Sequence, residues 1–502
     1  MFTLDWLSLK NGTDIRGIAV ENEFGEEVNL TNEVVTAIAR AFCVWLSQKT
    51  GKGKLTIALG HDSRISAPRL VACMEEGITS SGADVVLTGL SSTPSMFMLL
   101  NDESFPPCDG SVMLTASHLP YHRNGLKFFV KEGGLEGKDI AEILSIASEG
   151  KRLTGQGSVI ERPYIEKYAS DLVQKFREAT GEEQPLKGKR ILVDAGNGAG
   201  GFYVDLVLKP LGADTTGSQF LEPDGRFPNH IPNPENAEAM RSVCEAVKAA
   251  HADFGIIFDT DVDRAGAVDK NGEEINRNRL IALISAILLE EKKGTIVTDS
   301  VTSDGLASFI AAKGGKHLRF KRGYKNVINE SKRLNALGEY SPLAIETSGH
   351  AALKENYFLD DGAYLVTRIL ISLAKQAKEH KNLTDLIADL PCPAEAAEVR
   401  LTFQKGVDFK ALGAGVIQDF ERFAEKSPYA VIAPDNHEGM RVNFDKYHGD
   451  GWILIRMSLH EPIMPINLES ASVGGIKLLS KELSEFLRPY AFLNLEKLGE
   501  LL

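Results

Sequence analysis

Short apolar runs that end in polar or glycine-containing loops recur along the 502-residue chain. Three of them begin at Lys54, Lys189 and Gly294, with the sequences KLTIALG, KRILVD and GTIVTD. A stretch with helical spacing of apolar residues follows each, then a glycine-containing turn (SGAD, LGAD or KGGK), and then a second predicted strand. Strand, loop, helix, turn and strand form the βαβ unit, which predicts parallel strands covered by helices.

The distance between these repeats predicts related domains. They lie roughly a hundred residues apart, whereas the repeats of solenoid proteins have periods of about 20–50 residues. A polar, glycine-containing linker lies at 148–158, and two prolines in LPCPA at 390–394 end the preceding helix. The following sequence changes to short alternating stretches such as VRLTF. We therefore predict three α/β domains with mixed, mostly parallel sheets and a C-terminal α+β domain, at residues 1–155, 156–272, 273–390 and 391–502.

Composition and charge narrow the class of protein. Hydrophobic residues make up 43% and charged residues 25%, which is typical of a globular protein. The net charge of −13 argues against nucleic acid or an anionic membrane as the main partner, but a local cluster of cations can still bind a small anion. The longest apolar run, 280–289, is about half of the ~20 residues that a membrane span requires. The N-terminal sequence has no signal-peptide pattern, and the five cysteines are scattered. We expect a cytoplasmic protein, although an organelle transit peptide removed beforehand would leave no trace.

An acidic loop carries the strongest chemical signal. Asp259, Asp261 and Asp263 follow the apolar strand GIIF, and open α/β sheets bind ligands at the carboxyl ends of their strands. Alternating carboxylates are hard oxygen ligands suited to Mg²⁺ or Ca²⁺, and they would repel one another without a cation. An EF-hand does not fit, because its sixth and twelfth positions would be Arg264 and Lys270. The loop therefore predicts a metal site.

Other strand-end loops carry weaker signals. Ser117 and His118 follow the apolar strand SVML, where an ordinary strand-to-helix turn is the alternative to a nucleophile with a base. The segment DAGNGAGG at 194–201 contains a G-x-G-x-x-G pattern, so a dinucleotide-binding oxidoreductase remains an alternative at this point. The segments 322–325 (RGYK) and 456–458 (RMS) also follow strands. Their cations suit a phosphate, although such side chains are often merely solvated.

Taken in order, these loops resemble those of the α-D-phosphohexomutase superfamily, in its phosphomannomutase/phosphoglucomutase branch. The resemblance spans essentially the whole chain. It is carried by Asp14-Ile-Arg16-Gly17, Thr115-Ala-Ser117-His118 with Pro120, Lys127 in an N-G-x-K segment, Asp259–Arg264, Glu346-Thr-Ser348-Gly-His350, and Arg456-x-Ser458 before Glu461-Pro462. The glycine-rich segment 196–201 matches a structural turn of the family, which removes the case for a dinucleotide. The resemblance implies that the four domains surround a central cleft.

The resemblance also implies a reaction. An intramolecular phosphotransferase would interconvert hexose 6-phosphates and hexose 1-phosphates through a phosphoserine, with a hexose 1,6-bisphosphate as intermediate and activator. One Mg²⁺ per chain would be held by Ser117, Asp259, Asp261 and Asp263. The catalytic residues would be Ser117, His118, Lys127 and Arg16. The substrate-binding residues would be Arg264, Lys325, Glu346, Ser348, His350, Arg456, Ser458 and His460.

Some positions depart from the family pattern. Leu119 stands where asparagine is usual, and Thr260 and Val262 stand where glycine is common. Leu459 and His460 replace residues that would contact phosphate, and a protonated histidine would add a cation there. Because the serine and the three aspartates remain, we expect an active enzyme. A regulator that binds sugar phosphates but turns them over poorly is the alternative.

Overall fold

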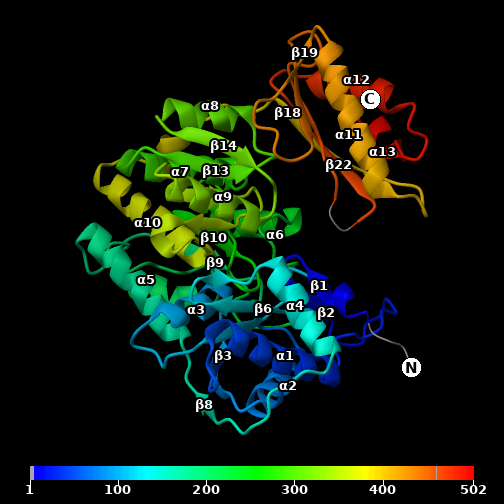
Figure 1. The fold of residues 1–502 in the computed structure, drawn as a ribbon. Helices are drawn as coiled ribbons and strands as arrows, with labels where there is room; N and C mark the ends of the chain where they lie inside the picture. The colour runs from blue at the N-terminus through cyan, green and yellow to red at the C-terminus, as the bar shows by residue number, and fades with distance from the viewer. Residues whose placement is uncertain (1–4, 459–460) are drawn as a thin grey trace. The chain divides into compact units, whose positions relative to one another are not determined.

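The computed structural model describes residues 5–458 and 461–502 (Figure 1). The chain forms two compact units. The first contains the residues up to Asn276 together with Ser348–Thr384, and the second contains Arg277–Thr347 and Asp385–Leu502. Within the described residues, every helix is too short or too polar to cross a lipid bilayer.

The N-terminal part of the first unit is an α/β domain on a mixed sheet with the order β1-β2-β6-β5-β3-β4-β8 and with β7 beside β6. Its strands are β1 (Lys10–Asn11), β2 (Asp14–Ile18), β3 (Thr56–His61), β4 (Asp84–Leu90), β5 (Gly110–Leu114), β6 (Arg123–Val130), β7 (Gly133–Gly134) and β8 (Val159–Glu161). Its helices are α1 (Asn32–Thr50), α2 (Ala67–Thr79), α3 (Thr93–Met98) and α4 (Gly137–Ser148), and α5 (Ile165–Thr180) follows. Strands β5, β3, β4 and β8 are parallel to one another, whereas β2 and β6 are antiparallel neighbours.

The register of β3 and β5 brings two loops together. His61 pairs with Leu114, so both strands end at the same level of the sheet. Every residue of β5 is buried, as expected for a central strand covered on both faces. Helix α1 packs against α2 and α4, and together they bury the apolar core that includes Phe42, Trp45 and Leu144. The chain segments after β3 and β5 are therefore neighbours at one edge of the sheet.

The second α/β domain of this unit has the sheet order β12-β11-β10-β9. Its elements are β9 (Ile191–Asp194), the π-helix η3 (Tyr203–Leu208), α6 (Ala237–Ala250), β10 (Phe254–Phe258), β11 (Ala265–Asp269) and β12 (Glu274–Ile275). Strands β9 and β10 are parallel, whereas β11 is antiparallel to both β10 and β12. The strand predicted after LGAD is wrong. The chain makes only isolated bridges there, at Asp214 and Gln219 among the described residues, because its polar sequence TTGSQ offers no alternating apolar face.

The first unit also contains the segment Ser348–Thr384. It comprises the antiparallel pair β16 (Ala351–Leu353) and β17 (Leu359–Asp360), the short helix η4 (Lys354–Asn356) and the helix α10 (Gly362–Lys378). Asp361 caps α10, because its side chain accepts a hydrogen bond from the Tyr364 N–H at 2.8 Å. The same carboxylate accepts a hydrogen bond from the Tyr168 hydroxyl on α5, which fixes α10 to the rest of the unit.

The second unit contains an α/β part and an α+β part. The α/β part comprises α7 (Asn278–Glu291), β13 (Thr295–Asp299), α8 (Asp304–Ala312), β14 (Lys316–Phe320), α9 (Tyr324–Ala336) and β15 (Leu343–Ile345), with β13 parallel to β14 and β15. The α+β part comprises β18 (Glu395–Thr402), α11 (Phe409–Lys426), β19 (Ala430–Ile432), β20 (Met440–Phe444), β21 (Gly451–Ile455), β22 (Ile463–Ser470), α12 (Gly475–Leu487) and α13 (Glu496–Gly499). Its strands form an antiparallel sheet in the order β18-β22-β21-β20-β19.

The predicted fold class is therefore confirmed. The α/β parts have mixed sheets in which parallel pairs form the βαβ crossovers, and the C-terminal part is an antiparallel sheet with helices. The short helices η1 (Trp6–Leu9), η2 (Leu99–Asn101) and η5 (Leu383–Ile387) complete the described elements.

Candidate active site

Ser117 lies in the loop after β5 and has an unusual backbone conformation. Its φ angle is 52°, in the left-handed region that residues other than glycine rarely adopt. Its N–H donates to Thr115 Oγ1 at 2.9 Å, and its Oγ donates to Asp259 Oδ2 at 2.9 Å. The side chain is buried, so the hydroxyl is directed at the acidic loop rather than at bulk solvent.

The acidic loop connects β10 and β11, which pair as a tight antiparallel hairpin with Phe258 opposite Ala265. Asp259, Asp261 and Asp263 are buried and can each offer a carboxylate oxygen within 4.8 Å of the others. Between them, Val262 has a φ of 64°, a strained conformation for a β-branched residue. The Gly362 N–H at the start of α10 donates to the Val262 carbonyl at 3.0 Å and holds this conformation.

Two neighbours from the first domain contact the acidic loop. Lys127 on β6 places its Nζ 2.8 Å from Asp261 Oδ2 and 2.5 Å from Asp263 Oδ2. The Thr93 hydroxyl donates to Asp261 Oδ2, and the Thr93 N–H donates to the Asp261 carbonyl at 2.8 Å. The serine, the lysine and the three carboxylates therefore form one buried polar cluster.

The donor set of this cluster fits a hard divalent cation. Asp261 Oδ1 and Asp263 Oδ1 are buried, and neither accepts a hydrogen bond from a residue that the structure describes. Burial and the charges of Asp263 and Asp261 raise the pKa of Asp259 well above its usual value. Burial would lower the pKa of Lys127, but Asp261 and Asp263 raise it well above the ordinary value, so the ammonium stays charged. Carboxylates with buried, unused oxygens are suitable ligands for such an ion.

His118 and Arg16 border the same cluster. The imidazole Nδ1 of His118 lies 3.4 Å from Ser117 Oγ. Burial, followed by the charges of Arg264 and Arg16, lowers the pKa of His118 to about 2, so the ring is neutral. Arg16 on β2 donates to Asp14 Oδ2 at 2.9 Å. The positive charge of Arg16 is one of those that lower the pKa of His118.

Arg264, Ser348 and His350 form a second group beside the acidic loop. The Arg264 Nε donates to His350 Nε2 at 3.2 Å, and Ser348 Oγ lies 3.0 Å from His350 Nδ1. Arg264 Nη1 lies 3.8 Å from Glu235 Oε2. All three side chains are buried. Within the first unit, the structure thus brings together the predicted residues Arg16, Ser117, His118, Lys127, Asp259, Asp261, Asp263, Arg264, Ser348 and His350.

Within the second unit, Glu346 holds the loop between β14 and α9. Its Oε1 accepts the Gly323 N–H at 2.6 Å. The neighbouring Asp299 at the end of β13 lies 3.8 Å from Arg322 Nε and accepts a hydrogen bond from Thr347 Oγ1 at 2.8 Å. Burial raises the pKa of Asp299 to about 7. The charge of Arg322 opposes this rise, and the charge of Glu346 adds to the rise. The predicted residue Lys325 lies in the first turn of α9, in the same loop region.

Arg456 and Ser458 follow β21 in the second unit. Burial, and then the charge of Arg322, lowers the pKa of Arg456. Ser458 Oγ accepts the Glu461 N–H at 3.2 Å. Leu459 and His460, which the sequence analysis singled out, lie outside the described residues. The predicted phosphate loop is thus described only in part.

Sequence reasoning missed several residues that hold the site. Thr93 contacts the acidic loop, and Arg64, which is bonded to Asp62, contacts the Ser117 loop. Asp299 and Glu438 contact the loop of Arg322 between β14 and α9. The carboxyl ends of strands are where Asp62, Arg64 and Asp299 lie, so the sequence could have marked them as candidate site residues. Thr93 and Glu438 had no such signal, because only tertiary contacts bring them to the loops.

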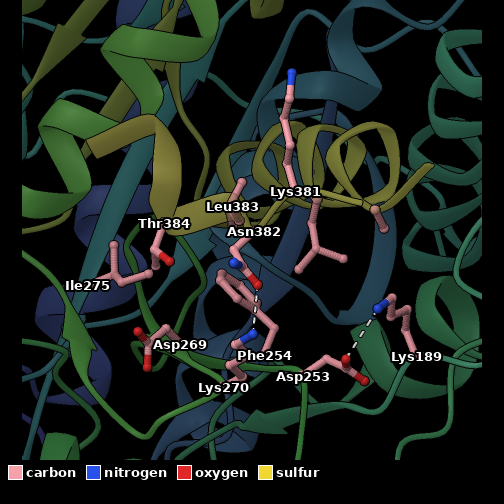
Figure 2. A pocket seen from close by; sticks show the side chains of 12 residues that line it. Lys189, Asp253, Phe254, Asp269, Lys270, Ile275, Lys381, Asn382, Leu383 and Thr384 are labelled. Carbon is pink, nitrogen blue, oxygen red and sulfur yellow. Dashed lines mark hydrogen bonds and ion pairs between the residues drawn. The ribbon is translucent and has the colours of Figure 1, made fainter. Parts of the chain in front are cut away.

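A separate pocket of about 100 Å³ lies at the opposite end of β10 (Figure 2). Phe254, the first residue of this strand, lines it, whereas Asp259 follows the last residue. Dashed lines in Figure 2 join two pairs of its lining residues: Lys270 donates to Asn382 at 2.6 Å, and Lys189 lies 3.3 Å from Asp253. This pocket therefore does not contribute to the chemistry of the acidic loop.

The fold and the site together define a class. Mixed α/β domains that gather a serine and three carboxylates in loops after strands, beside a lysine from a neighbouring strand, are typical of phosphotransferases that act with a divalent cation.

Comparisons with known proteins narrow this class. The family models for phosphoglucomutase/phosphomannomutase α/β/α domains I, II and III match residues 8–153, 163–272 and 276–392. A phosphoglucomutase of Neisseria gonorrhoeae is 32% identical over 92% of this chain and 93% of that protein. A phosphoglucomutase/phosphomannomutase of Thermococcus kodakarensis is 31% identical over 93% of this chain and 98% of that protein. The chain belongs to the phosphoglucomutase/phosphomannomutase family.

A solved structure agrees with this assignment. A phosphoglucomutase/phosphomannomutase family protein from Burkholderia thailandensis superimposes with a TM-score of 0.80 at 27% identity, and the match covers 98% of this chain and 100% of that one. The likeness therefore extends beyond the three matched domains into the C-terminal α+β part.

Proposed function

We propose that the protein is a phosphohexomutase that interconverts hexose 6-phosphates and hexose 1-phosphates through a phosphorylated Ser117 and a hexose 1,6-bisphosphate. The observation that carries the proposal is the Ser117 hydroxyl, 2.9 Å from Asp259 in a buried cluster with Lys127. The relatives are named as mutases, which favours turnover over a purely regulatory sugar-phosphate-binding role. We also propose domain boundaries near residues 155, 272 and 390.

The residues of the first unit would carry the chemical step. A phosphoryl group on Ser117 Oγ is transferred to a sugar hydroxyl: the bond from phosphorus to Oγ breaks, a bond to the sugar oxygen forms, and the proton of the sugar hydroxyl ends on Ser117 Oγ, which becomes the free serine hydroxyl. Asp259, Asp261 and Asp263, with Ser117, would hold one Mg²⁺, which when bound neutralises charge on the phosphoryl group. Lys127 supplies a fixed positive charge beside Asp261 and Asp263, and its ammonium, which stays charged, acts as a donor rather than as the acceptor of the proton.

Other side chains would position the substrate and support this step. Arg16 adds positive charge at the phosphoryl group, and His118 lies beside the serine hydroxyl as a neutral imidazole. The remaining residues would bind the hexose phosphate, with arginine forks on phosphate and a carboxylate on sugar hydroxyls. We assign this role to Arg264, Lys325, Glu346, Ser348, His350, Arg456, Ser458 and His460.

A coupled assay tests the proposal. Glucose 1-phosphate, mannose 1-phosphate and glucosamine 1-phosphate are offered side by side with Mg²⁺, with and without the corresponding 1,6-bisphosphate. We expect turnover of at least one substrate, activation by the bisphosphate, and loss of activity with a chelator. Peptide mass spectrometry should find the phosphate on Ser117. Turnover without any phosphorylated Ser117, or no turnover of any hexose phosphate, would contradict the proposal.

A further inference from the structure

Arg64 is a fully buried arginine whose side chain ends in the Ser117 loop. It follows β3, and its guanidinium donates hydrogen bonds to four backbone carbonyls. Nη2 donates to the carbonyls of Ser117 and Leu119, the latter at 2.6 Å. Nη1 donates to the carbonyls of Pro120 and Arg123 at 2.8 and 2.9 Å. One planar side chain therefore fixes the whole course of the loop.

This contact bears directly on the left-handed conformation of Ser117. An L-residue with a φ of 52° is disfavoured by its own sterics, so surrounding contacts must hold it. The Ser117 carbonyl accepts from Arg64, and the Ser117 N–H donates to Thr115 Oγ1, so both peptide groups of the residue are fixed. The direction of the Ser117 Oγ toward Asp259 follows from that conformation.

Arg64 is itself held from two sides. Its Nε lies 3.3 Å from Asp62 Oδ2, and both side chains are completely buried. Burial lowers the pKa of Arg64 and raises that of Asp62, and the charge of each partner opposes these shifts. On the other side, the Phe227 ring lies 5.2 Å from the guanidinium carbon. Gly225 approaches so closely that a Cβ would lie 2.3 Å from the Ile65 nitrogen.

The residues around Phe227 connect Arg64 to the acidic loop. The Asp224 N–H donates to the Asn197 carbonyl at 2.9 Å, in the glycine-rich turn after β9. In that same turn, the Ala199 N–H donates to the Thr260 carbonyl at 2.8 Å. A Cβ on Gly198 would lie 2.6 Å from the Thr260 oxygen, so only glycine permits this approach. A continuous set of contacts thus runs from Arg64 through loop 223–227 and the glycine-rich turn to the acidic loop.

We propose that Arg64 is a positioning residue that sets Ser117 in its left-handed conformation and holds its loop against the second domain, so that Oγ faces Asp259. This inference rests on the proposed function, and it assigns to Arg64 the maintenance of the geometry of the Ser117 loop. Lysine cannot replace it, because an ammonium has three donors and no planar fork for four carbonyls. The glycine-rich turn, whose sequence resembles a nucleotide-binding pattern, lies within this set of contacts, between loop 223–227 and the acidic loop.

The test compares Arg64→Lys with Arg69→Lys. Arg69 is the matched control, because its Nη2 donates to the carbonyls of Ala19 and Leu30, away from Ser117. For Arg64→Lys we expect kcat to fall by about 10²-fold with KM changed by less than about 3-fold, since displacement of a reacting group affects the chemical step most. We expect the control to keep wild-type kcat. Equal losses in both variants, or wild-type kcat in Arg64→Lys, would overturn the proposal.

Amide hydrogen exchange gives a readout that does not depend on activity. Residues 115–123 should exchange faster in Arg64→Lys than in the wild type and in Arg69→Lys. If the wild type has no mutase activity, the proposed function fails, while the exchange experiment still tests Arg64. Unchanged exchange in Arg64→Lys would overturn the positioning role. If Arg64→Lys does not fold, Gly225→Ala replaces it in the test. This variant keeps the Arg64 side chain, but the added Cβ displaces the backbone next to Arg64. A Gly225→Ala variant with wild-type kcat and wild-type exchange would overturn the proposal.

Discussion

Two clusters of charged residues differ in how their charges are satisfied. In the first unit, Ser117, Lys127 and the three aspartates are buried and bonded to one another. In the second unit, Glu346 and Glu438 accept backbone N–H groups of the Arg322 loop, and the Arg322 side chain is 25% exposed. In the first cluster the charged side chains therefore bind one another. In the second cluster the two carboxylates bind the backbone of the loop that carries Arg322. We interpret the first as the place of chemistry and the second as the place of substrate recognition.

The largest effect is expected at the centre of the first cluster. Ser117→Ala removes the oxygen that would carry the phosphoryl group, so kcat should fall by roughly 10⁴-fold or more. Ser145→Ala, on the exposed face of α4, should keep wild-type turnover. A coupled assay measures kcat, and mass spectrometry should show that phosphate incorporated from the bisphosphate is lost only in Ser117→Ala. Substantial turnover by Ser117→Ala would contradict the interpretation that the first cluster carries out the chemical step.

Lys127→Met tests whether the charge beside the serine contributes to the chemical step. The substitution leaves Asp261 and Asp263 without their ammonium partner, and kcat should fall by about 10²–10⁴-fold. KM should change much less, because the second cluster would still bind the substrate. Lys131→Met is the control, since this exposed lysine follows the same strand and lies outside the cluster. A rise in KM with unchanged kcat would place Lys127 in substrate recognition instead.

The sequence predicted the first cluster better than the second, and the reason is physical. Ser117 and Asp259 each come after the carboxyl end of a buried apolar strand, the position at which α/β sheets bind ligands, although these strands, β5 and β10, belong to different sheets. Glu346, by contrast, acts on Gly323 through a contact set by loop geometry. Arg64 lies 53 residues before Ser117, and its four carbonyl acceptors depend on loop shapes that periodicity does not describe.

The grouping of the chain into compact units depends on long-range contacts. Arg277–Thr347 belong to the second unit and Ser348–Thr384 to the first, and the predicted domain boundaries near residues 155, 272 and 390 stay a proposal. Local patterns identify α10 as a helix, but only its long-range contacts, such as the Tyr168–Asp361 hydrogen bond, assign it to a unit. The strand expected after LGAD is replaced by isolated bridges for a local reason, because the polar sequence there offers no alternating apolar face.

Glu346→Gln tests the second cluster with a smaller expected effect. Glutamine keeps an oxygen for the Gly323 N–H but loses the charge that could accept two sugar hydroxyls. kcat/KM for hexose phosphates should fall by about 5–150-fold, while inhibition by vanadate stays nearly unchanged. Glu438→Gln is the matched control, because Glu438 Oε2 accepts the Arg322 N–H at 3.0 Å and holds the same loop. Equal losses in both variants would show that Glu346 serves the loop rather than the sugar.

The smallest effect concerns the pH dependence of the second cluster. Burial raises the pKa of Asp299 to about 7, so the group is mostly neutral at pH 6 and mostly ionised at pH 8. The charged groups around it are Arg322, Glu346 and Arg456. Ionisation adds a negative charge beside the two arginines and should weaken the binding of an anionic substrate. KM should therefore rise by about 2–5-fold between pH 6 and 8 with little change in kcat, because ground and transition states share this effect.

Asp299→Asn isolates this contribution from the titration of the substrate phosphate, which also occurs near pH 6. Asparagine keeps an oxygen for Thr347 Oγ1 but stays neutral at every pH. Its KM profile should be flatter than that of the wild type, with the largest difference at pH 8, where the wild type carries the extra charge. Asp304→Asn is a control from the same unit, and its profile should follow the wild type. Parallel profiles for Asp299→Asn and the wild type would show that Asp299 does not act on substrate binding. A change confined to kcat would instead mean that the second cluster takes part in the chemical step.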